Sequence, residues 1–208
     1  MEETRTATCC PAKAAILDFG GVLAEDGFHA ALEKLAQDYG KDPQQMKEEA
    51  EEELFRSGYL TRGCGEGTYW EAFRERTGIE ESDRQLRARV LASFVLRPHM
   101  LDLVVRLRQA KIPVVILSDQ TNWLSELDEK TPFFHLFDRI FNSYRTGHTK
   151  KDPEAFREVL RYLNLPPEAT LFVDDRKSNV ETARSLGMQA ILYTDRESFY
   201  QAFWEHWI

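Results

Sequence analysis

Short apolar runs alternate with amphipathic stretches along the second half of the chain, from residue 98 onward. The runs "IPVVILS", "DRIFNS", "ATLFVD" and "QAILY" are brief and rich in branched residues, which is typical of strands. Before, between and after them lie "HMLDLVVRLRQA", "DPEAFREVLRYLNL", "NVETARSLGM" and "RESFYQAFWEHW", whose apolar residues recur at helical spacing. This alternation predicts a parallel sheet with helices on both faces.

One further apolar run, residues 14–19, lies far from the others along the chain. It must join the same sheet, because a lone strand cannot satisfy its backbone hydrogen-bonding groups. The stretch between, 24–97, reads as successive helices without strands, separated by Gly, Pro or Ser-Asp starts. We therefore predict an α/β, Rossmann-like core formed by 1–23 and 98–208, with a loose tail over 1–11. A helical insert over 24–97 interrupts this core.

The charge balance restricts the partners of the chain. Its 208 residues include 27 Lys and Arg against 35 Asp and Glu, for a formal net charge of −8. Lys and Arg are scattered, so the basic patch that nucleic-acid binding requires is not expected. The acidic run "KEEAEEELF", residues 47–55, predicts the solvated face of a helix.

Cysteine usage and hydropathy indicate a cytoplasmic protein. Cys9, Cys10 and Cys64 form no CxxC pair, which favours a reducing compartment over a disulfide framework. The start "MEETRTATCCPAK" has no apolar region typical of a signal peptide, and no apolar stretch approaches the ~20 residues of a membrane span. The aromatic end "SFYQAFWEHWI" is expected to close the sheet or to form a dimer contact, so we expect a monomer or a homodimer.

Polar side chains cluster at the carboxyl ends of the predicted strands, where open parallel sheets bind ligands. They are Asp18, Ser118, Asp119, Asp174 and Asp175, with Lys150 and Lys151 just before a helix. Clustered carboxylates share protons or hold a cation, and oxygen ligands favour Mg²⁺. A Mg²⁺ ion, a lysine and a hydroxyl would cradle a phosphoryl group, and a neighbouring carboxylate would attack its phosphorus.

Four segments resemble, in order, the four motifs of the haloacid dehalogenase-like (HAD) hydrolases. They are "ILDFGGVL", "VILSD", "GHTKKDPEAF" and "LFVDDRKSNVETARSLGM". The resemblance covers the α/β part, and its order and spacing are more specific than any single motif. The helical insert resembles the small cap that one subgroup carries between the first two motifs. Within that subgroup, the chain is similar to sugar-phosphate phosphatases that include glucose-1-phosphatase-like members.

The resemblance implies a Mg²⁺-dependent phosphatase of small, sugar-phosphate-like metabolites that forms an aspartyl-phosphate at Asp18. It implies that Ser118 binds the phosphoryl oxygens and that Lys150 offsets charge beside Asp18. The implied metal ligands are Asp18, the backbone carbonyl of Gly20, Asp175, and Asp174 either through water or as a support. Asn179 would stabilise the metal-binding loop.

The sequence departs from the family at Gly20, where phosphatases carry a second Asp as general acid and base. Such help is worth roughly 10²–10⁴-fold in rate. Glu25 or Asp26 could replace it, the substrate could be an acyl phosphate that needs little protonation, or the protein could be slow. Asp119 stands where Asn is common, and His148 lies close enough to Lys150 in sequence to face the site.

Two other functions stay open on the same residues. Gly20 and Asp119 also fit a weak or inactive HAD-like protein that only binds phosphorylated metabolites. A metal-independent haloacid dehalogenase likewise lacks the second Asp, but the adjacent acids Asp174 and Asp175 argue against it.

The insert is expected to set substrate specificity, because its residues can reach beyond the phosphate. The candidates are Glu25, Asp26, Phe28, His29, Tyr59, Tyr69 and Trp70. Tyr69, Trp70 and Phe73 stand at helical spacing and are expected to form the core of the insert instead.

Overall fold

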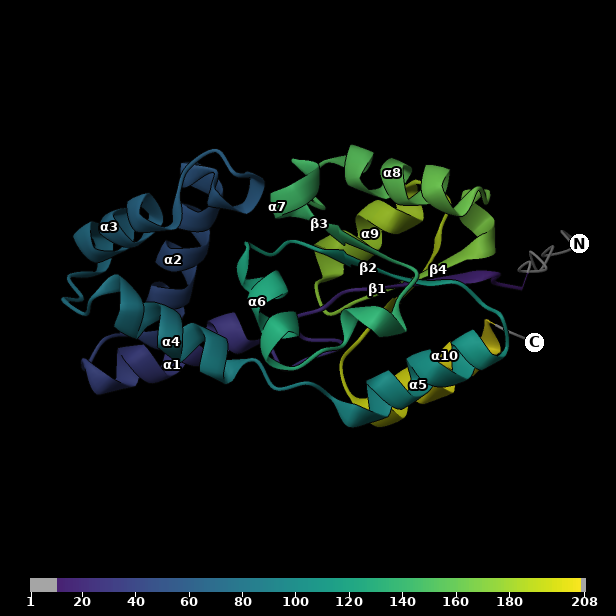
Figure 1. The fold of residues 1–208 in the computed structure, drawn as a ribbon, viewed down its shortest axis with the longest axis horizontal. Coiled ribbons are helices and arrows are strands. Elements are labelled where there is room, and N and C mark those ends of the chain that lie inside the picture. Colours follow the sequence, from purple (N-terminus) through teal and green to yellow (C-terminus); the bar gives the residue numbers. More distant parts are fainter. Residues whose placement is uncertain (1–10, 207–208) are drawn as a thin grey trace, which may run out of the picture.

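A five-stranded parallel sheet forms the centre of the computed structural model, which describes residues 11–206 (Figure 1). The strands are β1 (Ala14–Leu17), β2 (Val114–Ser118), β3 (Arg139–Asn142), β4 (Thr170–Asp174) and β5 (Gln189–Leu192). Their order is β3-β2-β1-β4-β5, with Leu17 in register with Ile116 on one side and Val173 on the other. The predicted α/β class is confirmed, whereas most of the predicted loose tail lies outside the described residues.

Helices cover both faces of the sheet, which explains why its strands are apolar on both sides. On one face, α5 (Pro98–Gln109) and α10 (Arg196–Glu205) pack against a cluster that contains Leu17 (Figure 1). On the other face, α8 (Pro153–Leu163) and α9 (Lys177–Ser185) pack against Ile16. The aromatic helix near the end of the chain therefore closes the sheet through Phe199 and Phe203, as one of the two expectations had it.

Short elements complete the core. They are α6 (Trp123–Lys130), α7 (Ser143–Thr146) and the 3-10 turns Phe134–Leu136 and Pro167–Ala169. Helix α8 has a capped start, since the Asp152 side chain accepts the N–H of Glu154 and Pro153 occupies the first turn.

The insert consists of helices around a hydrophobic cluster that also includes Trp123 of α6. They are α1 (Gly27–Asp38), α2 (Pro43–Ser57), α3 (Glu66–Thr77) and α4 (Asp83–Ser93), with the 3-10 turn Tyr59–Thr61. Tyr59, Tyr69, Trp70 and Phe73 are buried in this cluster. Their packing role, expected for three of them, leaves them unavailable to a substrate.

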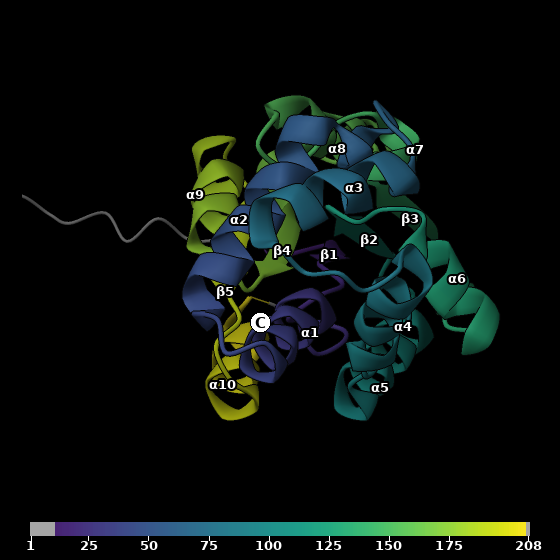
Figure 2. The ribbon, with the colours of Figure 1, turned by 90° about the vertical axis from the view of Figure 1, so that its left-hand side faces the viewer.

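The two segments that connect the insert to the core run side by side. Ala24 and Leu96 form an antiparallel bridge. The guanidinium of Arg97 donates to both carboxylate oxygens of Glu25, from Nε to Oε1 at 3.0 Å and from Nη2 to Oε2 at 2.8 Å. Figure 2 shows α1–α4 in front of the ends of the central strands. We infer from the hydrophobic cluster that these helices share and from the paired connections that 24–97 is a cap domain.

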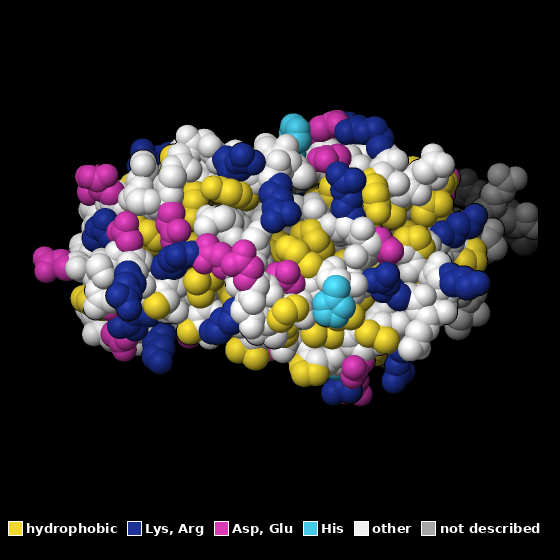
Figure 3. Space-filling view, viewed as in Figure 1, with side chains coloured by type: hydrophobic (Ala, Val, Ile, Leu, Met, Phe, Trp, Pro, Cys, Tyr) yellow, Lys and Arg dark blue, Asp and Glu magenta, His cyan; other side chains and the backbone are white. Residues whose placement is uncertain are grey.

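The charged surface agrees with the scattered charges of the sequence. In Figure 3, acidic and basic side chains are intermingled over the visible face, and Lys and Arg form no continuous stripe there. Among residues 11–206, no helix has the length and apolar character needed to span a bilayer.

Candidate active site

A cavity of about 160 Å³ lies between the carboxyl ends of the strands and the insert. Its lining includes the following sequence-predicted residues: Asp18, Gly20, Asp26, Phe28, Ser118, Asp119, Lys150, Asp175 and Asn179. Parallel strands end on one edge, so β1, β2 and β4 bring together acids and a hydroxyl that are far apart in sequence.

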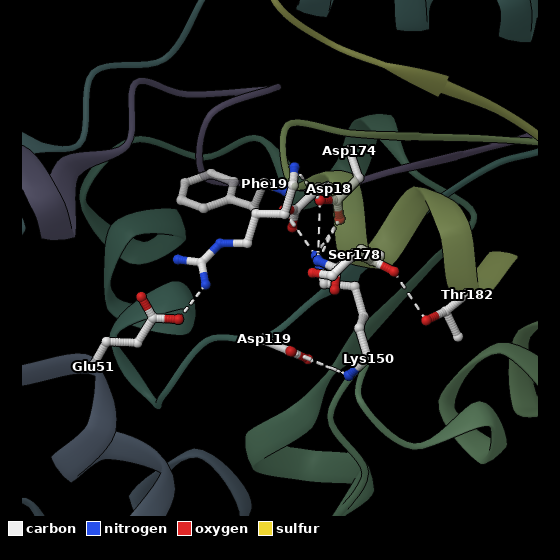
Figure 4. Close-up of polar contacts among 10 residues, drawn as sticks. Asp18, Phe19, Glu51, Asp119, Lys150, Asp174, Ser178 and Thr182 are labelled. Atoms are coloured by element: carbon white, nitrogen blue, oxygen red, sulfur yellow. Dashed lines mark hydrogen bonds and ion pairs between the residues drawn. The ribbon is translucent and has the colours of Figure 1, made fainter. Parts of the chain in front are cut away.

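Lys150 is the cation at the centre of this site. Its Nζ lies 2.8 Å from Asp18 Oδ2 and 2.6 Å from Asp174 Oδ2, and its side chain is only 2% exposed (Figure 4). Burial lowers the pKa of Lys150, but Asp174 and Asp18 outweigh burial and raise that pKa above its ordinary value. The lysine therefore stays charged and compensates two buried carboxylates at once.

Asp18 ends β1 in a position suited to a nucleophile. The Phe19 N–H donates to its Oδ1 at 2.7 Å, while Oδ2 faces Lys150. Burial raises the pKa of Asp18 well above its ordinary value; Lys150 opposes this rise, and Asp174 and Asp175 add to it. A cation bound beside these carboxylates would favour the ionised form, which is the nucleophilic one.

The two adjacent acids that end β4 differ in their surroundings. Asp174 is fully buried, and both of its oxygens are occupied by Lys150, the Asn179 amide at 3.0 and 3.1 Å, and the Arg176 N–H at 2.8 Å. Asp175 has no hydrogen-bond or ion-pair partner within the described part of the chain, 11–206, and it lines the cavity. Burial, Asp174 and Asp26 raise the pKa of Asp175 to about 6.

This arrangement fits a divalent cation. Asp18, Asp174 and Asp175 each offer one carboxylate oxygen, and these atoms lie within 4.8 Å of one another. Asp175 is the member whose oxygens are free to bind, whereas Asp174 is engaged in holding Lys150 and Asn179. All-oxygen ligand sets of this kind suit Mg²⁺.

The absence of a side chain at Gly21 leaves room for the Asp175 carboxylate. Replacement of Gly21 by Ala is therefore expected to impair cation binding. Gly21 has φ +78°, and a Cβ there would lie 2.0 Å from Asp175 Oδ2, so the carboxylate would be displaced. We expect Gly21→Ala to weaken Mg²⁺ binding by about 10- to 100-fold, as support-residue changes at metal sites do. Isothermal titration with Mg²⁺ measures this.

Gly40→Ala provides the matched control for that variant. Gly40 also has a positive φ, of +62°, but a Cβ there would meet no atom within 4 Å, and Gly40 lies outside the cavity lining. Equal Mg²⁺ affinities for the two variants would contradict the assigned role of Asp175.

Ser118 is the last residue of β2 and Asp119 follows it, and the two side chains have different surroundings. Ser118 is 3% exposed, lines the cavity, and its hydroxyl has no hydrogen-bond partner among residues 11–206. Asp119 accepts the backbone N–H of Lys150 at 2.8 and 3.1 Å. Burial raises the pKa of Asp119, and Lys150 opposes this rise. Asp119 thus holds the loop that carries Lys150, a contact that the Oδ1 of an Asn could also make, so the structure gives no reason for an acid at this position.

Two of the predicted acid–base candidates are not brought to the cavity. Glu25 is exposed and held by Arg97, whose contacts draw it toward the connecting segments. His148 is 40% exposed and pairs with Asp152 at 2.8 Å. Neither residue lines the cavity. Asp26 does line it, so it is the candidate among the three that the structure retains.

A chain of charged side chains joins the cap to the core beside the cavity, and the sequence did not reveal it. His29 contacts Asp26 at 2.7 Å and Glu51 at 3.3 Å, and Arg176 donates to Glu51. Burial lowers the pKa of His29, but hydrogen bonds to Asp26 and Glu51 raise it to about 9. Burial raises the pKa of Asp26 and His29 lowers it, with a net fall below its ordinary value.

The acidic run on α2 is therefore only partly solvated, contrary to expectation. Glu51 is half-buried in the chain just described, and Glu53 is 1% exposed, paired with Arg56 at 2.8 Å. Nothing in the run "KEEAEEELF" distinguishes Glu51 from its exposed neighbours, because its partners His29 and Arg176 lie elsewhere in the sequence.

The fold and this rim of acids, hydroxyl and lysine are those of a hydrolase built on a Rossmann-like sheet. Residues 12–187 match the family described as "Hydrolase: haloacid dehalogenase-like hydrolase". Because the match covers most of the chain, the protein belongs to the haloacid dehalogenase-like hydrolases and is an enzyme of that family.

Individual relatives match over shorter segments. The chain is 45% identical over 62 residues to drimenol cyclase drtB of Aspergillus calidoustus, covering 30% of this chain and 12% of that protein. It is 38% identical over 61 residues to D-ribitol-5-phosphate phosphatase of Bacteroides thetaiotaomicron, covering 29% of this chain and 30% of that protein. The matched segments thus span less than a third of either relative.

Solved structures share the whole fold. A HAD family enzyme of Bacteroides thetaiotaomicron has a TM-score of 0.74 at 22% identity, with 93% of this chain and 99% of that chain covered. The same enzyme in complex with magnesium and inorganic phosphate has a TM-score of 0.70 at 23% identity, with 92% and 99% covered.

Proposed function

We propose that the protein is a Mg²⁺-dependent phosphatase of small phosphorylated metabolites that acts through an aspartyl-phosphate at Asp18. The observation that carries the proposal is the buried Lys150, which bridges Asp18 and Asp174 while Asp175 is left free for a cation. The D-ribitol-5-phosphate phosphatase among the relatives and the magnesium and phosphate complex among the structural neighbours support it. The glucose-1-phosphatase-like subgroup and a sugar-phosphate-like substrate stay predictions.

Asp18, Lys150 and Ser118 would have separate roles in a reaction of two steps. The Asp18 carboxylate attacks phosphorus, and the bond between phosphorus and the ester oxygen breaks, so that the departing oxygen takes a proton from solvent water and leaves as the alcohol. Water then attacks the phosphorus of the aspartyl-phosphate, which releases inorganic phosphate and regenerates Asp18. Lys150 and Ser118 would bind the phosphoryl oxygens throughout.

Mg²⁺ would be held by Asp18, Asp175 and the carbonyl of Gly20. When bound, it neutralises charge on the phosphoryl oxygens and on the carboxylates that face them.

The proton that the leaving alcohol needs has no donor at Gly20. Asp26 lines the cavity, but His29 holds its pKa low, which suits a base better than an acid. Among esters of similar size and polarity, the proposed enzyme should therefore favour those whose alcohol leaves readily.

Introducing the missing acid is expected to raise the rate on alkyl esters. Gly20 has room for a Cβ, with Phe94 Cε1 at 3.8 Å as the nearest atom, and its φ is not in the left-handed region. We expect Gly20→Asp to increase kcat for an alkyl phosphate by at least about 10-fold. A well-placed general acid typically contributes more, roughly 10²–10⁴-fold in rate. Phosphate release from an alkyl ester, against Gly20→Asn as control, measures this.

The dependence of that gain on the leaving group is the decisive comparison. An alcohol that leaves without protonation, such as p-nitrophenol, should show little of it. An equal gain on both esters would contradict the account of Gly20.

The proposed activity is tested by phosphate release from a panel of phosphomonoesters and acetyl phosphate, with Mg²⁺ and with a chelator. Turnover that the chelator abolishes and added Mg²⁺ restores is the expected result. No turnover on any member, together with no Mg²⁺ binding by calorimetry, would sink the proposal.

A protein that only binds phosphorylated metabolites is the second candidate, favoured by the absence of a side chain at Gly20. It predicts that inorganic phosphate with Mg²⁺ raises the melting temperature while no ester is hydrolysed. A metal-independent dehalogenase would instead release halide with the chelator present, and the free carboxylate of Asp175 disfavours that activity.

A further inference from the structure

Five apolar side chains line the side of the cavity that faces the strand ends, beside the acids Asp26 and Glu51. They are Phe28, Leu54, Phe55, Leu60 and Phe94, all from the cap and its connection to the core, and we call this surface the apolar wall. Phe55 and Phe94 are half-buried, whereas the other three are buried. A substrate whose phosphate lies against Asp18 would direct its alcohol portion toward this wall.

The charged groups on the cap side of the cavity are already paired. Asp26 and Glu51 are both bound by His29, and Glu51 is also bound by Arg176. The ammonium of Lys151 lies 3.4 Å from the centroid of the Phe55 ring. A ligand hydroxyl that reached these groups would have to compete with ion pairs or with a cation–π contact.

Besides Ser118 and Asn179, the uncharged polar side chains that line the cavity are Gln120 and Ser178. The Gln120 Oε1 accepts the N–H of Thr121, so this side chain offers a ligand only its amide nitrogen, and Ser178 offers a single hydroxyl. A polyol leaving group carries a hydroxyl on every carbon, and each one buried without a partner costs binding free energy. An alkyl or aryl group has no such requirement.

Phe94 brings the apolar surface to the point where the alcohol departs. Its Cε1 lies 3.8 Å from the position of a Cβ at Gly20, two residues after Asp18. The family position that would hold an acid therefore adjoins an aromatic ring, and a leaving group passing between them meets carbon on one side.

We infer that the substrate is a monophosphate ester of an apolar alcohol, aliphatic or aromatic, whose body packs on Phe55 and Phe94. The inference rests on the proposed phosphatase function and names its substrate class. It replaces the expected sugar phosphate with an ester whose alcohol has few hydroxyl groups.

The test compares n-pentyl phosphate with ribitol 5-phosphate, which have the same number of carbons. We expect a kcat/KM at least about 10-fold higher for n-pentyl phosphate, and a rise of roughly two- to fourfold per methylene from methyl to pentyl phosphate. Where turnover is slow, n-pentylphosphonate and ribitol 5-phosphate are compared as competitive inhibitors of p-nitrophenyl phosphate hydrolysis. Equal or better use of ribitol 5-phosphate, or its tighter binding, overturns the inference and leaves the phosphatase standing.

A substitution in the cap tests whether the apolar wall causes the preference for n-pentyl phosphate. We expect Phe55→Asn to reduce kcat/KM for n-pentyl phosphate by about 5- to 30-fold with little change for ribitol 5-phosphate, and a melting curve confirms that it folds. Tyr39→Asn is the control, because Tyr39 is a cap aromatic that is 42% exposed and outside the cavity lining. Equal losses on both esters would overturn the inference. Failure of the wild-type protein on every ester, activated p-nitrophenyl phosphate included, overturns the phosphatase function itself and the inference with it.

Discussion

Replacement of Asp18 by Asn is expected to reduce phosphate release by at least about 10³-fold, as removal of a covalent nucleophile does elsewhere. The Asn amide has nearly the same shape but cannot attack phosphorus. It also carries an NH₂ group where Asp18 receives Lys150 on one oxygen and the Phe19 N–H on the other. Single-turnover and steady-state phosphate release measure the loss.

Two controls make the Asp18→Asn result specific. Asp102→Asn changes an exposed acid on α5 and should leave the rate within about twofold, since surface substitutions have small effects. Far-UV circular dichroism and thermal melting confirm that the Asp18 variant folds. Full activity in a folded Asp18→Asn protein would refute the aspartyl-phosphate mechanism.

Replacement of Lys150 by Met is expected to remove activity and to destabilise the fold by about 3–5 kcal/mol, the usual cost of leaving a buried charge uncompensated. Asp18 and Asp174, 6% and 0% exposed, would lose the ammonium that contacts them both. Urea unfolding measures the change in the free energy of unfolding. Lys177→Met is the control, because Lys177 is 80% exposed and only 3.7 Å from Glu181, and such pairs contribute under about 1 kcal/mol.

The destabilisation by Lys150→Met should depend on pH in a fixed direction. A buried carboxylate without its cation has a higher pKa in the folded protein than in the unfolded chain, as burial already raises the pKa of Asp18. The cost is therefore full above the folded pKa and falls as the pH drops below it. Unfolding at pH 7 and pH 5 should show a smaller difference from wild type at pH 5; an unchanged difference would mean that lost packing, not lost charge, is responsible.

Much of the fold follows from local patterns. Residues from 98 onward alternate between strand and helix patterns, and short-range periodicity is a direct consequence of which side chains each element must bury. Asp18, Ser118 and Asp174 were predictable as neighbours because all parallel strands present their carboxyl ends at one edge of the sheet. That rule needs only the strand ends and no knowledge of packing.

The sequence could not predict which of two neighbouring acids is paired and which is free in the cavity. Asp174 and Asp175 are adjacent in sequence, yet one is fully paired and the other is free, because the chain turns at the end of β4. Glu25 and Asp26 are likewise adjacent, and Arg97 draws the first away while the second lines the cavity. In each pair, the two adjacent side chains point in different directions, and this difference decides which of them is free in the cavity.

The sequence by itself determined an α/β fold with an inserted set of helices and the acids, hydroxyl and lysine at the rim of its sheet. Only the tertiary structure decided what faces them: the ion pair of Arg176 with Glu51, 125 residues apart, and the apolar wall that includes Phe55 and Phe94. The reason is physical. Periodicity reports which face of a helix is buried, whereas the partner that buries it depends on how the cap packs against the core.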